Sequence, residues 1–199
     1  MKIITIPHKT LRQPASPVVT VDKKLTRFVA DLRETLAQKE NPRGVGLAAP
    51  QVNTLWNIFV TQLPPDEAHD DEEDLLQQMY INPKIIDHSD QQTLGPDKRR
   101  PLLEGCLSIP DLYGPVWRWE WVQLQFSTLL GSELQEQTAY FQNFAARVIQ
   151  HEYDHLQGVL FIDHSAEHGL PLYQENHKTE ELVEVEPSFI EAIIAQSRP

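Results

Sequence analysis

The ten residues 149–158 read IQHEYDHLQG and carry His151 and His155 four positions apart, with Glu152 beside the first histidine. In a helix, residues i and i+4 lie on one face, so both imidazoles can direct a ring nitrogen at one metal ion. Glu152 is rotated by roughly 100° from His151, which places its carboxylate beside the ion, where a base for a metal-bound water is needed. The stretch therefore predicts a metal-binding helix.

The residues before this motif predict the rest of that helix and a hairpin. Apolar residues at helical spacing extend the helix, and Gly158 can end it; those residues are Tyr140, Phe144, Val148, Ile149 and Leu156. Further upstream, residues 119–127 alternate between apolar and polar side chains, which predicts a strand. Residues 133–141 can return beside it as the second strand, after a turn at LLGS.

Helices are also expected near both ends of the chain. Five apolar residues recur at helical spacing in the first of them: Leu25, Phe28, Val29, Leu32 and Leu36. Asp22 can cap this helix, and residues 40–44, ENPRG, stop it. A last helix is expected over residues 186–197, where Ser188 and Glu191 have the spacing of a capping box.

The remaining segments predict strands and a turn. Residues 56–63 and 79–86 are expected to be strands, residues 44–51 a tight turn or loop, and residues 159–165 a short buried strand or extended segment. Together the elements predict an α+β fold, with antiparallel or mixed β-sheets around a central metal-binding helix and with N-terminal and C-terminal helices.

Composition and charge narrow the kind of protein. For 199 residues we expect a single domain over residues 1–199, with an acidic loop insertion at residues 66–74 and a divergent C-terminal extension at residues 165–199. The net charge of -12 argues against direct nucleic-acid binding, since phosphate contacts need clustered Lys and Arg. The start has no secretory signal and no stretch has roughly 18 apolar residues, so we expect a cytoplasmic protein without membrane contact.

The identity of the third metal ligand is open at this point. A catalytic zinc-type site usually takes three protein ligands and leaves a position for water. A metzincin has a third histidine at the position that Phe161 occupies here. A thermolysin-like peptidase would use Glu175, but Gly and Pro near it do not favour the required helix. Cys106 is the remaining soft ligand, although a lone cysteine in an apolar stretch is more often a core residue.

Three motifs together resemble one family. They are GVGLAAPQ at residues 44–51, EGCLS at residues 104–108 and QHEYDH at residues 150–155. In this order they resemble the glycine-rich, cysteine and histidine motifs of peptide deformylase. The similarity extends from the start of the chain to about Asp163, and it points to a single peptide deformylase-like domain.

The resemblance implies the metal site. Cys106, His151 and His155 would bind one divalent ion, and Glu152 would be the general acid/base. Fe(II) is the ion that the family commonly uses, with zinc, nickel or cobalt able to take its place, and this ligand set alone does not choose among them. A divalent ion also lowers the pKa of the thiol, so the cysteine would bind as thiolate.

The resemblance also implies the substrate contacts. The side-chain amide of Gln51 and the backbone N–H of Leu107 would hold the oxyanion of the reaction. Gly44, Val45 and Gly46 would bind the main chain of the substrate as an added strand, because glycine allows a close approach. Val45 and Leu107 match positions that line the methionine pocket.

The implied reaction is hydrolysis of the formyl group from the N-terminal formylmethionine of newly synthesised polypeptides. Metal-bound hydroxide would attack the formyl carbon while Glu152 moves the proton. The partners would be formyl-Met nascent peptides, with a transient ribosome contact. Two alternatives stay open: a zinc peptidase that uses a downstream carboxylate, and a non-catalytic metal-binding relative.

Several other residues have expected roles or depart from the family pattern. Glu104 and Arg118 resemble a buried charge pair behind the metal. Gln150 and Asp154 are expected to support the helix and the ligands. Tyr113 stands where the family often has a basic residue near the substrate, which leaves the preference among peptides open.

Overall fold

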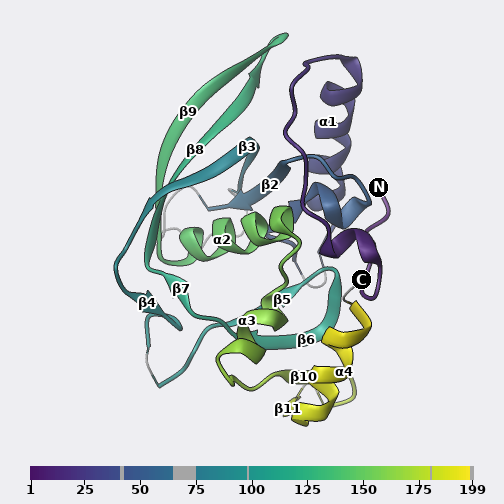
Figure 1. Ribbon diagram of the computed structural model, residues 1–199, viewed down its shortest axis with the longest axis vertical. Coiled ribbons are helices and arrows are strands. Elements are labelled where there is room, and N and C mark those ends of the chain that lie inside the picture. Colours follow the sequence, from purple (N-terminus) through teal and green to yellow (C-terminus); the bar gives the residue numbers. More distant parts are fainter. Residues whose placement is uncertain (41–42, 65–74, 98, 180, 198–199) are drawn as a thin grey trace.

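Helix α2 (Asn143–Gln157) crosses the middle of the molecule between a large sheet and a smaller one (Figure 1). The computed structural model describes residues 1–40, 43–64, 75–97, 99–179 and 181–197. The predicted α+β arrangement around a central helix is confirmed, with helices towards both ends of the chain.

The large sheet is antiparallel, and its five strands follow the order β1-β2-β3-β8-β9. Its strands are β1 (Gly46–Ala48), β2 (Ile58–Leu63), β3 (Leu76–His88), β8 (Trp121–Leu130) and β9 (Glu133–Gln142). The expected hairpin is confirmed as β8 and β9, which turn at Gly131 with a φ of 64°. The two strands expected around the acidic insertion are β2 and β3, and the insertion itself, residues 66–74, lies outside the described residues.

The smaller sheet has four strands in the order β11-β10-β6-β5, and it lies on the other side of α2 (Figure 1). Its strands are β5 (Leu103–Cys106), β6 (Ile109–Pro115), β10 (Tyr173–Asn176) and β11 (Glu181–Glu184). Two short strands, β4 (Gln92–Thr93) and β7 (Arg118–Trp119), form a separate pair. The last two strands of the chain therefore extend the sheet that contains Cys106.

The expected first helix is α1 (Lys23–Ala37), and it packs against the large sheet. Its start is capped because the side chain of Asp22 accepts a hydrogen bond from the backbone N–H of Leu25 at 2.8 Å. All five apolar residues of the predicted stripe are buried in one cluster with β1 and β2. Burial of each contributes about 1.5–3 kcal/mol to folding, so the helix is held by its apolar face.

Helix α2 is shorter than the apolar pattern suggested. Val148, Ile149 and Leu156 are buried as expected, and the helix ends at Gly158 with a φ of 74°. Tyr140, however, lies in β9 and is 56% exposed, so its assignment to the helical stripe was wrong. Phe144 is on the helix but 42% exposed, because the first turn faces a cleft rather than the core.

The short buried strand or extended segment predicted at residues 159–165 is wrong from Phe161 onward, since helix α3 (Phe161–Glu167) begins there. Asp163 accepts a hydrogen bond from the backbone N–H of Leu160 at 2.8 Å, which favours a helical start. A short apolar run cannot be assigned to strand or helix from its periodicity alone. Asp163 also forms an ion pair with Arg12 of the 3-10 helix η1 (Lys9–Arg12).

Two smaller expectations are also corrected. The segment 44–51 was expected to be a turn or loop, but it contains β1 and the start of the 3-10 helix η2 (Ala49–Val52). The last helix is α4 (Pro187–Ser197), so Ser188 lies in its first turn rather than at its cap. Proline suits the first helical position because its missing N–H is not needed there.

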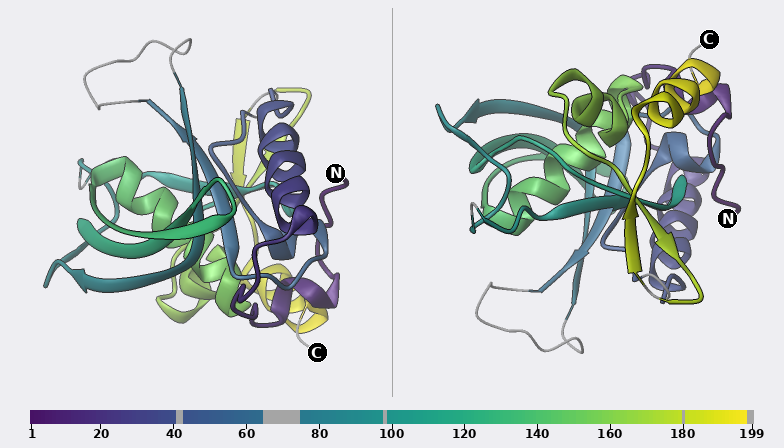
Figure 2. Two further views of the ribbon diagram at one scale, coloured as in Figure 1. Left: turned by 90° about the horizontal axis from the view of Figure 1, so that it is seen from above. Right: turned by 90° about the horizontal axis from the view of Figure 1, so that it is seen from below.

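Residues near the two ends of the chain meet on one side of the molecule. Helix α4 contacts α3 and η1, and both views of Figure 2 show the N-terminal segment close to it. Ile190 and Ile194 of α4 are buried in the same apolar cluster as Leu11 and Phe161. Over the described residues, the helices are too short or too polar to cross a membrane.

Candidate metal centre and active site

The three predicted metal ligands lie together. His151 and His155 come from α2, and Cys106 from the end of β5. Sγ of Cys106 is 3.2 Å from Nε2 of His155, and one donor atom of each residue lies within 4.8 Å of the other two. A tetrahedral ion bound at typical metal–N and metal–S lengths separates its donor atoms by about 3.5 Å. The donor set therefore fits a divalent transition-metal ion.

The surroundings of Cys106 favour its thiolate form. Burial raises the pKa of the thiol, but the charges and hydrogen bonds of His155 and His151 outweigh it and lower the pKa to about 5. Burial lowers the pKa of His151, but the hydrogen bonds and charges of Cys106 and Glu104 outweigh it and raise the pKa. The deprotonated sulfur is the form that a metal ion needs.

A buried charge cluster stands behind the ligands, as the pair Glu104 and Arg118 predicted. Oε2 of Glu104 lies 3.0 Å from Nδ1 of His151, which leaves Nε2 of that ring for a metal. Arg118 donates to both carboxylate oxygens of Glu104, at 3.0 and 2.9 Å. Burial alone would raise the pKa of Glu104, but Arg118 and His151 hold it well below its usual range.

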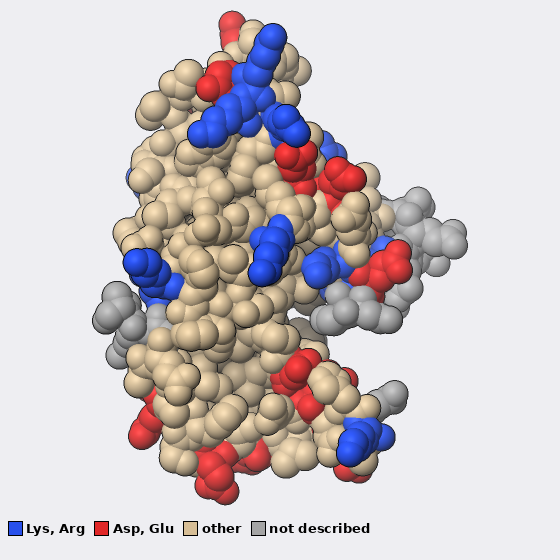
Figure 3. Space-filling model, turned by 90° about the vertical axis from the view of Figure 1, so that its right-hand side faces the viewer, with Lys and Arg blue, Asp and Glu red and all other residues tan. Residues whose placement is uncertain are grey.

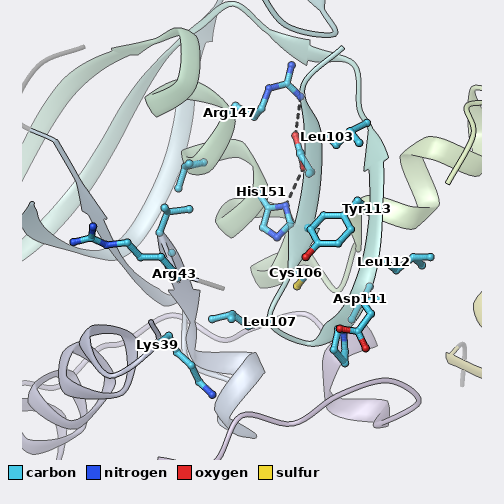
Figure 4. Close-up of a pocket in the computed structure, with 18 of the residues that line it drawn as sticks. Lys39, Arg43, Leu103, Cys106, Leu107, Asp111, Leu112, Tyr113, Arg147 and His151 are labelled. Carbon is cyan, nitrogen blue, oxygen red and sulfur yellow. Dashed lines mark hydrogen bonds and ion pairs between the residues drawn. The ribbon is translucent and has the colours of Figure 1, made fainter. Parts of the chain in front are cut away.

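Arg147 also belongs to this charge cluster, and sequence reasoning missed it. Its guanidinium donates to Oε1 of Glu104 at 2.9 Å (Figure 4). It also donates to the backbone oxygen of Val116 at 2.8 Å. The available signal was helical spacing, because Arg147 precedes His151 by one turn and lies on the same face. Two arginines therefore neutralise Glu104 and the nearby Asp154.

The supporting roles expected for Gln150 and Asp154 agree with their contacts. The side chain of Gln150 bonds to the backbone N–H and C=O of Trp119, both at 3.0 Å, which joins α2 to β7. Asp154 accepts a hydrogen bond from Arg118 at 2.5 Å and lies 2.8 Å from His164. Neither side chain is among the three grouped metal ligands.

Glu152 is buried beside the ligands. It is 3% exposed, and its Oε2 has no hydrogen-bond partner among the residues that the structure describes. Burial raises the pKa of Glu152 to about 7, against the opposing charges of His151 and His155. A carboxyl group with a pKa near neutrality can both take up and release a proton at physiological pH.

Gly46 makes room for this carboxylate. A Cβ at position 46 would lie 2.3 Å from Oε1 of Glu152, far inside any real contact distance. Gly46 is in β1, so a glycine in this edge strand leaves the space that the Glu152 carboxylate occupies.

Gln51 is oriented by the backbone. Its Oε1 accepts a hydrogen bond from the N–H of Ala48 at 2.8 Å, so its NH₂ group must face the other way. That group lies 3.5 Å from Sγ of Cys106 and 3.3 Å from Oγ of Ser108. Leu107 follows Cys106 in the chain and lines the cleft. The prediction that its backbone N–H donates a hydrogen bond to the oxyanion stays a prediction.

One cleft of about 860 Å³ is lined by Gln51, Cys106, Leu107, His151 and Glu152. Gly44, Val45 and Gly46 are on its β1 side, and Leu103, Cys106 and Tyr113 are on the side of the smaller sheet (Figure 4). Figure 3 shows this side of the molecule hollowed between two lobes. The volume is in the range of small-ligand and peptide sites.

Glu175, the downstream carboxylate considered for a peptidase, is not grouped with the histidines. It groups instead with Asp111 and His177 at another part of the cleft wall. Its Oε2 accepts a hydrogen bond from the hydroxyl of Tyr113 at 3.1 Å. The ligand set is therefore Cys-His-His, with a buried carboxylate beside it, which is the site of a metal-dependent hydrolase.

Comparison with known proteins identifies the family. The model of the polypeptide deformylase family matches residues 1–169. Peptide deformylase 2 of Nostoc sp. is 36% identical over 164 residues, which cover 82% of this chain and 84% of that protein. Peptide deformylase 1 of Bacillus subtilis is 35% identical over 160 residues, which cover 80% and 86%.

A solved structure agrees with the sequence matches. The Met-Ala-Ser-bound peptide deformylase of Acinetobacter baumannii superposes with a TM-score of 0.68 at 29% identity, over 82% of this chain and 97% of that one. This chain belongs to the polypeptide deformylase family, as the three motifs predicted. The family is metal-dependent, and the Cys-His-His group is present here.

Proposed function

We propose that this chain removes the formyl group from the N-terminal formylmethionine of newly synthesised polypeptides. The observation that carries the proposal is the convergence of three metal-binding side chains, a buried carboxylate and an oriented amide: Cys106, His151, His155, Glu152 and Gln51. All of these except His155 line one cleft. Membership of the polypeptide deformylase family supports the same reaction.

The substrate would bind as an added strand. β1 is at one edge of the large sheet and β5 is at one edge of the smaller sheet, and residues of both line the cleft. An extended peptide can pair with such an edge through main-chain hydrogen bonds. Gly44 lets the chain pack closely beside this edge, because a Cβ there would lie 2.8 Å from Cδ1 of Leu36 and 3.3 Å from Cδ1 of Leu107. Val45 and Leu107 would then contact the methionine side chain.

The chain's own residues prepare the site for a metal. A divalent ion bound to Cys106, His151 and His155 supplies Lewis acidity, which polarises the formyl carbonyl and lowers the pKa of a water molecule. Glu104 fixes the ring of His151, and the thiolate of Cys106 adds a soft ligand. We propose Fe(II) as the native ion, since the resemblance to the family implies it, while zinc, nickel and cobalt suit the same donors.

Glu152 would move the proton. Its Oε2, which has no partner among the described residues, can take a proton from the attacking water, and the same group can return it to the leaving amine nitrogen. The amide of Gln51 and the N–H of Leu107 would donate hydrogen bonds to the oxyanion that forms. Loss of one such donor typically slows the reaction by about 10² to 10³.

The proposed substrate also bears on where the protein works and what it contacts. Nascent polypeptides would be met during synthesis, so we propose a cytoplasmic enzyme with a transient contact to the ribosome. We also propose that residues 1–199 act as one domain. β10 pairs with β6, and α4 packs against α3, which supports including the C-terminal extension in it.

Release of formate from a formyl-Met peptide tests the proposal. The protein is purified anaerobically, its metal content is measured, and Cys106→Ser and Glu152→Gln are compared with the exposed control Glu133→Gln. Cys106→Ser should lose metal and activity, whereas Glu152→Gln should keep its metal and lose about 10³-fold in rate. Full activity in Cys106→Ser, or no formate from the metal-loaded wild type, would overturn the proposal.

The same preparation tests the peptidase alternative. Glu175→Gln should keep its full metal content, because Glu175 is grouped with Asp111 and His177 rather than with the metal ligands. Loss of metal in this variant would instead support a downstream carboxylate ligand.

A further inference from the structure

Two carboxylates face the substrate cleft on the wall formed by the smaller sheet. Asp111 is on β6 and Glu175 is on β10, and both line the same cleft as Cys106 and Glu152. Asp111, Glu175 and His177 each place one polar atom within 4.8 Å of the others. Figure 4 shows Asp111 and Tyr113 on the same wall as Cys106. We name Asp111 and Glu175 the acidic wall.

Strand register brings these carboxylates together. β10 pairs with β6 in an antiparallel register that sets Tyr173 opposite Tyr113 and Gln174 opposite Leu112. Continuing this register by one residue sets Glu175 opposite Asp111. Glu175 lies beyond residue 169, where the match to the family model ends. The segment beyond the family match therefore adds a negative charge to the cleft wall.

The register is held by close packing. Gly114 lies on β6, and a Cβ there would meet Cδ2 of Leu172 at 2.2 Å. Leu172 is fully buried, so it fills the space that the glycine leaves. This packing seats β10 against β6 with little freedom to slide.

The acidic wall has few compensating partners. Like charges directly opposite each other on neighbouring strands are destabilising. Glu175 accepts a hydrogen bond from the neutral hydroxyl of Tyr113, and His177, which is 67% exposed, lies 3.1 Å from Asp111. The carboxylates therefore favour a cation in the cleft between them.

The cleft is also the place where we expect the substrate peptide to bind, so a cationic side chain of that peptide can reach the acidic wall. Glu152, which lines the same cleft, is 3% exposed, and its Oε2 has no hydrogen-bond partner within the described part of the chain, so a reacting molecule that meets this carboxylate must enter through the cleft. The peptide chain that follows formylmethionine must leave the metal along one of the walls. Lys39 and Arg43 line the cleft with Gly44 on the other side, so the two sides carry opposite charge.

We propose that Glu175 and Asp111 form a specificity site for a lysine or arginine side chain in the substrate, downstream of formylmethionine. The inference rests on the proposed deformylase function and adds a preference within it. A partly exposed pair of this kind contributes a modest amount, so we expect about 3- to 10-fold in kcat/KM for a basic over an acidic side chain. The preference should weaken as salt is added.

The test measures kcat/KM on formyl-Met peptides that carry Lys, Gln or Glu at the second, third or fourth residue. Wild type should favour Lys over Glu by about 3- to 10-fold at one of these positions. Glu175→Gln should reduce that ratio to below about 2, and Glu175→Lys should reverse it. Glu184→Gln is the matched control, because Glu184 is exposed on the neighbouring strand β11 and does not line the cleft.

The outcomes separate the two proposals. Equal rates on all peptides, or an unchanged ratio in Glu175→Lys, would overturn the specificity site and leave the deformylase function standing. If wild type releases no formate from any peptide, the function itself fails. A second equivalent of zinc that binds wild type and is lost in Asp111→Asn would make this cluster a metal site and overturn the inference. Melting temperatures verify that each variant is folded.

Discussion

Glu104 Oε2 lies 3.0 Å from Nδ1 of His151, and this buried contact joins the strand of the cysteine ligand to the helix of the histidine ligands. Glu104 is two residues before Cys106 on β5, and His151 is on α2. Both arginines of the charge cluster, Arg118 and Arg147, also bind this carboxylate. One buried residue thus orients a ligand and couples the two elements of the metal centre.

The first prediction is that Glu104→Gln lowers metal affinity by about 10- to 100-fold, because the neutral amide orients His151 less strongly and leaves two arginines undercompensated. Competition with a chromophoric chelator measures the affinity. Glu120→Gln is the control, since Glu120 is exposed. Equal affinities for Glu104→Gln and wild type would show that the contact has no part in metal binding.

The second prediction concerns Gly46→Ala. Its Cβ would lie 2.3 Å from Oε1 of Glu152, so the carboxylate must move. We expect formate release to fall by about 10² or more, because proton transfer depends on position, while metal content stays the same. Metal analysis and formate release on one preparation measure both. Normal activity in this variant would mean that Glu152 is free to move without loss.

The third prediction tests how the C-terminal extension is seated. Gly114→Ala should destabilise the protein by about 1–3 kcal/mol, since its Cβ would overlap Leu172. Urea unfolding measures the loss, and limited proteolysis reports release of the segment after residue 169. The double variant Gly114→Ala/Leu172→Ala should regain part of the lost protection. No recovery in the double variant would show that the overlap is not the cause.

The fourth prediction is a pH dependence away from the metal. Burial raises the pKa of Tyr80 to about 12, against a weaker effect of its bond to Thr61. Since the folded-state pKa is above the ordinary value of 10.0, the stability that Tyr80 contributes is complete below pH 10 and lost as pH rises towards 12. Relative to wild type, Tyr80→Phe should gain about 1 kcal/mol between roughly pH 9 and 11.

Urea unfolding of wild type and Tyr80→Phe at roughly pH 9 and at roughly pH 11 measures this difference in the free energy of unfolding. Tyr140→Phe is the control, because Tyr140 is 56% exposed and has the same chemistry at the surface. The idea fails if the stability difference between Tyr80→Phe and wild type is the same at both pH values.

Elements with a clear period could be predicted from the sequence. The amphipathic stripe of α1 and the alternation in β8 follow from side chains that must face one core. The segment that became α3 could not, because its apolar run, residues 159–162, is too short to show a period, and its cap depends on Asp163, which also pairs with Arg12 from the start of the chain. Tyr140 was misplaced because helical and strand spacing overlap where β9 runs into α2.

The sequence by itself determined the spacing of His151, Glu152 and His155, since helical periodicity fixes which side chains share a face. The motif resemblance extended this to Cys106 and Gln51. Only the tertiary structure decided that Arg147 joins Glu104, and that Glu175 lies close to Asp111 and His177 rather than with the metal-binding group. Such contacts depend on strand register and on packing between segments far apart in the chain, which local periodicity does not encode.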